Sequence, residues 1–70
     1  MPMIEIKDKE GNMRWISVFP FNSLDAAHLY VKNSSVPLKI VKGKGAVYWV
    51  CASEDAKWAI KFGYEEMKDD

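Results

Sequence analysis

Two short segments of this 70-residue chain repeat one pattern thirty residues apart, and this repetition constrains the fold more than any other feature. Ser23-Leu24-Asp25-Ala26 aligns with Ser53-Glu54-Asp55-Ala56. In each segment a hydroxyl side chain that can cap a helix precedes one or two acidic residues that complement the helix dipole. Each segment follows a strand-like stretch, in which Arg14-Trp15-Ile16 aligns loosely with Tyr48-Trp49-Val50. The sequence therefore predicts two copies of a strand-to-helix unit.

The first half of the chain has the pattern of a β-hairpin. Met3–Lys7 alternates apolar and charged residues, as a half-buried strand does. Asp8–Asn12 is a polar connection with a glycine, which is typical of a tight turn. Met13–Phe19 is rich in β-branched and aromatic residues, and we expect Pro20 to end this second strand because proline cannot donate to a sheet.

The second half predicts another pair of strands. Leu38–Lys42 alternates in the same way, and Gly43-Lys44-Gly45 is typical of a turn. Ala46–Ala52 is an apolar run, which predicts a central strand covered on both faces.

A helix is expected after each pair of strands. Asn22 or Ser23 would cap the first helix, and Ser53 would cap the second. The second helix is expected to continue to about Met67, although Gly63 is a possible C-terminal cap that would end it earlier.

These elements predict an α+β fold with the order ββα-ββα in a single domain of residues 1–70, with an internal repeat of units 3–35 and 36–68. We expect one four-stranded antiparallel or mixed sheet with both helices on one face. Moving the first strand to the end of the chain gives the ferredoxin-like order, so the arrangement is a permuted form of it. Met3–Lys7 and Leu38–Lys42 would be the sheet edges, where charged side chains discourage aggregation.

Few residues in this chain are suited to catalysis or to holding a metal. His28 is the only histidine and Cys51 the only cysteine. Cys51 lies in an apolar strand, where a free thiol usually behaves as a small hydrophobic group, so neither residue is assigned a role. The expected protein is not an enzyme and binds no metal or cofactor.

Charge and hydropathy narrow the class of protein further. The formal net charge is zero, which disfavours strong non-specific binding to nucleic acid. The apolar run Ala46–Ala52 is too short to cross a membrane, so no membrane segment is expected. A single cysteine fits a reducing compartment, and a cytoplasmic location is the expectation.

Aromatic residues are the main candidates for function, because they make up 13% of so short a chain. In the predicted sheet, Trp15 and Trp49 lie on adjacent central strands at matched positions. Two registers remain open. In one register both indoles fill the core beneath the helices, and in the other both stand on the open face of the sheet.

The open-face register predicts a binding surface. Its expected residues are Met13, Arg14, Trp15, Phe19, Trp49, Lys42 and Lys44. Aromatic residues, Met and Arg are enriched in protein interfaces, so a small regulatory protein-binding module is expected, an adaptor or an inhibitor that binds another protein, a second copy of itself, or both. The alternative is single-stranded nucleic-acid binding. The predicted surface resembles in topology the sheet of the RNA-recognition motif, although the consensus sequence of that motif is absent.

Overall fold

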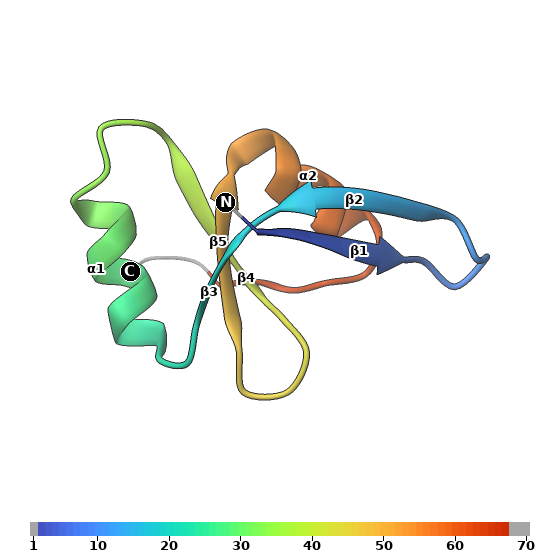
Figure 1. Ribbon diagram of the computed structural model, residues 1–70, viewed down its shortest axis with the longest axis horizontal. Coiled ribbons are helices and arrows are strands. Elements are labelled where there is room, and N and C mark those ends of the chain that lie inside the picture. The colour runs from blue at the N-terminus through green and yellow to red at the C-terminus, as the bar shows by residue number, and fades with distance from the viewer. Residues whose placement is uncertain (1, 68–70) are drawn as a thin grey trace.

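The computed structural model describes residues 2–67, and within them it contains six strands and two helices (Figure 1). In chain order these are β1 (Met3–Lys7), β2 (Met13–Ser17), β3 (Phe19–Phe21), α1 (Leu24–Lys32), β4 (Leu38–Lys42), β5 (Tyr48–Ala52), α2 (Ser53–Lys61) and β6 (Glu66–Met67). The α+β class is confirmed, but the element order differs from the expected ββα-ββα. The short strands β3 and β6 are additions, and the expected second unit, 36–68, ends at a residue outside the described range.

The strands form two antiparallel sheets instead of one. β1 and β2 pair only with each other, while the larger sheet has the order β3-β5-β4-β6. The predicted single sheet is therefore wrong. β5 lies between β3 and β4, which confirms the central position expected for the apolar run.

The division into two sheets occurs at Val18. β2 ends at Ser17, and the Val18 amide donates to the Pro2 carbonyl at 2.9 Å, which is the last bond of the hairpin. The next residues form β3, which pairs with β5. Pro20 lies inside β3 instead of ending a strand, and proline is tolerated there because β3 is an edge strand with β5 as its one neighbour in the sheet.

The two helices cover opposite faces of the larger sheet, so the expectation that both lie on one face is wrong (Figure 1). Ile40 and Val50 pack with the buried Ala27 of α1. Val41 and Cys51, their neighbours along the strands, point to the other face and pack with α2. β4 and β5 carry buried side chains on both faces, and one layer of helices cannot cover both.

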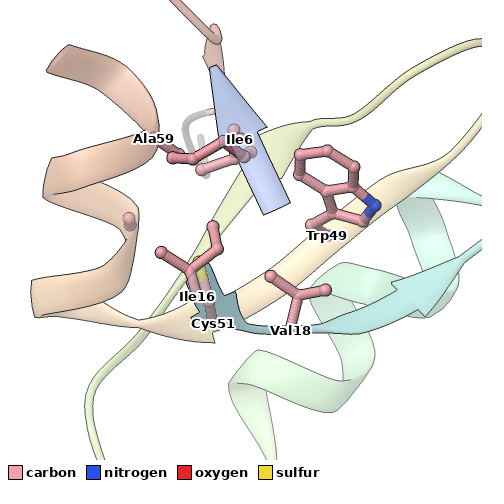
Figure 2. Packing of buried hydrophobic residues seen from close by; sticks show 8 residues of the cluster. Ile6, Ile16, Val18, Trp49, Cys51 and Ala59 are labelled. Carbon is pink, nitrogen blue, oxygen red and sulfur yellow. The ribbon is translucent and has the colours of Figure 1, made fainter. Parts of the chain in front are cut away.

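The β1–β2 hairpin lies on the same side of the larger sheet as α2. The hairpin, the larger sheet and α2 contribute buried residues to one cluster, in which Figure 2 labels Ile6, Ile16, Val18, Trp49, Cys51 and Ala59. The hairpin is thus attached to the domain through one of its faces.

The ends of the helices follow from local sequence. Ser23 caps α1 as expected, accepting a bond from the Ala26 amide. Ser53 is instead the first residue of α2, and Ala52 precedes it without a side-chain cap. α2 ends at Lys61, so the predicted extension to Met67 is wrong. Gly63, with a φ of 103°, donates to the Ile60 carbonyl and ends the helix as glycine commonly does.

The segment after α2 changes the position of β4. Glu66–Met67 pairs with β4, so β4 is an interior strand and not the predicted edge. Lys39 of β4 lies 3.6 Å from the Glu66 carboxylate. The predicted edge position of β1 is correct, but it is an edge of the hairpin.

Candidate functional site

The two faces of the β1–β2 hairpin differ in burial. Alternation along the strands places Ile4, Ile6, Arg14 and Ile16 on the face toward the larger sheet, where Ile6 and Ile16 are fully buried. The other face, called here the hairpin outer face, consists of Met3, Glu5, Lys7, Met13, Trp15 and Ser17. The inner face therefore anchors the hairpin and leaves the outer face open to contact.

Three large apolar side chains of the hairpin outer face are more than half exposed. The exposed fraction is 53% for Met3, 55% for Met13 and 58% for Trp15. Within the described part of the chain nothing covers them, although Ser17 donates a hydrogen bond to the Met3 thioether. Apolar side chains grouped on one face are typical of an interaction site.

Trp49 does not belong to this surface. It is only 7% exposed and lies in the core between the sheet and the hairpin (Figure 2), where its ring centroid is 5.2 Å from that of Tyr64. β2 does not pair with β5, so Trp15 and Trp49 are not neighbours across a sheet. Neither predicted register is correct, because one indole is exposed and the other is buried.

Arg14 has a different position from the one expected. It lies on the inner face of the hairpin, and its guanidinium carbon is 3.9 Å from the centroid of the Trp58 ring on α2. Lys61 approaches the same ring at 5.0 Å. A cation over an indole face is attracted by the ring quadrupole. Arg14 therefore connects the hairpin to α2 and does not join Met13 and Trp15.

Phe19 lies on the α1 side of the larger sheet. Its ring centroid is 5.3 Å from that of Tyr30, and Phe21 contacts the same ring at 5.5 Å. A shallow hollow of about 630 Å³ adjoins this cluster, bordered by Leu29, Tyr30 and Phe21. Phe19 and Trp15 are therefore associated with different layers of the molecule.

Lys42 and Lys44 lie at the turn between β4 and β5, on another part of the molecule. The Lys42 ammonium donates to the Gly45 carbonyl at 3.1 Å and lies 5.2 Å from the Tyr48 ring. Lys44 is exposed. Of the seven predicted site residues, only Met13 and Trp15 lie on the hairpin outer face.

Met3 is the apolar residue of this surface that the sequence interpretation missed. The alternation of Met3–Lys7 already placed Met3 opposite to Ile4 and Ile6. Pairing of the two predicted strands then brings Met3 to the face that carries Met13 and Trp15. The alternation of β1 therefore predicts Met3 as an outer-face residue.

Cys51 is unsuited to nucleophilic chemistry. It is fully buried on the α2 side of the sheet, whereas α1, which carries His28, packs on the other side. Burial, together with the smaller effect of the Asp55 charge, raises the pKa of the Cys51 thiol to about 12. The thiolate, which is the reactive form, is therefore strongly disfavoured.

Residues 2–67 contain no group of three or more His, Cys, Asp or Glu side chains placed to hold a metal ion. Neither described helix is long and apolar enough to cross a membrane. Comparison of the chain with protein-family models, with curated proteins and with solved structures found no match.

Proposed function

We propose that this protein is a small, non-enzymatic protein-binding module, and that the hairpin outer face is its contact surface. The observation that carries the proposal is the exposure of Met3, Met13 and Trp15 together on one face of a hairpin whose other face is buried. An adaptor or inhibitor role in the cytoplasm is part of the same proposal, as is association with a second copy.

The chemistry of this face fits a protein partner. Trp is among the residues that dominate binding energy in interfaces, and Met adapts its shape to an irregular surface. Glu5 and Lys7 lie on β1 beside these residues and would supply a polar border. The inner face holds the hairpin against the core, so a partner would meet a surface that is already formed.

Single-stranded nucleic-acid binding has less support. It needs aromatic side chains side by side, on which successive bases stack, with cations beside them. Trp15 lacks the neighbours that this function needs, because Trp49 is buried and Lys42 and Lys44 lie at a separate turn. Protein binding is therefore the better supported of the two functions.

Capture of partners from the native lysate tests the proposal. Tagged wild-type protein is compared with Trp15→Ala, with Met13→Ala and with the control Leu29→Ala, which removes an exposed apolar side chain from α1 on the other side of the sheet. We expect a stoichiometric partner with wild type and with Leu29→Ala. Trp15→Ala should weaken its binding about 30-fold or more, since truncation of an interface hot spot costs about 2 kcal/mol or more.

The same capture is repeated after nuclease treatment. A protein partner that stays bound supports the proposal, whereas partners lost on digestion favour the nucleic-acid alternative. Equal capture by Trp15→Ala and wild type, with both proteins folded, would show that the hairpin outer face is not the contact surface.

A further inference from the structure

The outer edge of β1 has backbone groups with no partner in the described chain. Pro2 bonds Val18 and Asp8 bonds Asn12 across the hairpin, so the bonded pairs between them are Ile4 with Ile16 and Ile6 with Arg14. The amides and carbonyls of Met3, Glu5 and Lys7 therefore point away from β2. β1 pairs with no other described strand.

The two edges of the hairpin have different neighbours. α2 packs beside β2 and holds it through Arg14 and Trp58. β1 packs mainly against β2, and it forms the lower strand of the projecting hairpin in Figure 1. A strand with unpaired amides and carbonyls is a template for another strand, and a two-stranded ribbon gains stability from further strands.

The charges on β1 are complementary to those of a second β1 in one register. Consider two copies of β1 side by side and antiparallel, related by a twofold axis at Ile6. Glu5 of each copy then lies opposite Lys7 of the other, on the same face, and both residues present outward backbone groups for bonding. A twofold axis at Glu5 or at Lys7 would instead place like charges opposite each other.

We propose that the occupant of the β1 edge is a second copy of this chain, paired antiparallel about Ile6. The result is a closed dimer with one continuous sheet of order β2-β1-β1-β2. The outer faces of the two hairpins then lie side by side, and Met3, Met13 and Trp15 of both copies share one sheet face. This deepens the proposed function, of which self-association is one part, but it depends on the edge and its charges and not on the apolar side chains.

Charge exchange tests the dimer directly. Sedimentation equilibrium across a wide concentration range should show wild-type protein in reversible exchange between monomer and dimer. Glu5→Lys and Lys7→Glu each create two like-charge contacts across the twofold axis, and each should weaken the dimer roughly 3- to 30-fold. The double variant E5K/K7E restores both pairs and should return to within about twofold of wild type.

Mixing the two single variants gives a second, independent result. Glu5→Lys carries two lysines on the edge and Lys7→Glu two glutamates, so the mixture should associate more tightly than either variant alone. Lys57→Glu, an exposed charge reversal on α2, is the matched control and should leave dimerisation unchanged. In wild type, the Glu5 and Lys7 amides should become protected from hydrogen exchange as concentration rises.

Three outcomes would overturn the dimer. They are a wild-type protein that stays monomeric at the millimolar concentrations used for NMR, single variants that dimerise as well as wild type, and a dimer lost in Trp15→Ala but unchanged by charge exchange. The proposed function is judged separately by capture with Trp15→Ala. If Trp15→Ala captures partners as well as wild type does, while the charge-exchange variants behave as expected, the dimer is supported and binding of a separate protein by the hairpin outer face is not.

Discussion

The hairpins β1–β2 and β4–β5 come from similar sequence units, yet they occupy opposite environments. Each has a tryptophan in its second strand. β4–β5 lies at the centre of the larger sheet, with layers on both faces, and Trp49 is buried. β1–β2 has only one covered face, and Trp15 is exposed. The environment of a strand therefore depends on the layers around it as well as on its own residues.

The cause of the difference is where each helix goes. α2 begins directly after β5 and packs on the Cys51 side of the sheet, where the first hairpin also lies. α1 follows β3 and covers the opposite side. No described element covers the hairpin outer face. The hairpin outer face, which we propose for binding, therefore has no covering layer among the described residues. The β4–β5 hairpin, in contrast, is covered on both faces.

Removing each tryptophan gives the largest test of this comparison. Trp49→Ala should cost about 3–5 kcal/mol of the free energy of unfolding, because it leaves a cavity in the core. A domain of this size rarely has more than about 3–5 kcal/mol to lose, so the variant should be largely unfolded. Trp15→Ala should cost less than about 1 kcal/mol, as exposed substitutions usually do.

Urea denaturation followed by circular dichroism measures both values. Trp49→Phe, which retains part of the buried ring, provides a folded variant in which the loss can be measured if Trp49→Ala does not fold. Comparable losses for Trp15→Ala and Trp49→Ala would show that the two hairpins are equally buried in solution, and would contradict the proposed binding surface.

A substitution at Gly43 tests how closely the β4–β5 turn packs on Trp49. A Cβ atom at this position would lie 2.6 Å from the Trp49 side chain, closer than a Cβ atom approaches its neighbours in a folded protein. Gly43→Ala should therefore cost about 1–3 kcal/mol through overpacking. Lys44→Ala, the exposed neighbour, is the control and should change stability by less than about 0.5 kcal/mol. Thermal unfolding of both variants is the measurement, and equal melting temperatures would contradict close packing of the turn on the indole.

Local features of the fold could be predicted from sequence, and the layer arrangement could not. The strand Met3–Lys7 and the capping role of Ser23 could be predicted, because each depends on residues only a few positions apart. The passage from β2 to β3 at Val18 depends on which distant strand is free to pair with Phe19–Phe21. Pro20 suggested a strand end because an edge position, where proline is tolerated, is not visible in the local pattern.

The candidate site was predictable in the same limited way. Met13 and Trp15 follow from alternation within one hairpin, and Met3 could have been added by the same rule. Phe19 and Trp49 were assigned wrongly because their faces depend on the division into two sheets. Arg14 was assigned wrongly although alternation alone places it on the face opposite to Met13 and Trp15, where it meets Trp58 of α2.

The turn of the first hairpin gives the smallest expected effect, which depends on pH. The Asp8 carboxylate accepts bonds from the Asn12 side chain and from the Glu10 and Asn12 amides, each at 2.9 Å. These bonds, that from the Asn12 side chain above all, hold the pKa of Asp8 below its ordinary value of 3.8. Because the folded-state pKa is the lower one, the stabilisation is complete above pH 3.8 and is lost as the pH falls through the folded-state pKa.

An NMR titration of the Asn12 amides should show a midpoint below 3.8 and no matching change at the Gly43 amide of the β4–β5 turn, which donates to the Val47 carbonyl. Asp8→Asn should abolish the transition, and a midpoint at or above 3.8 would show that the carboxylate does not hold this turn in solution.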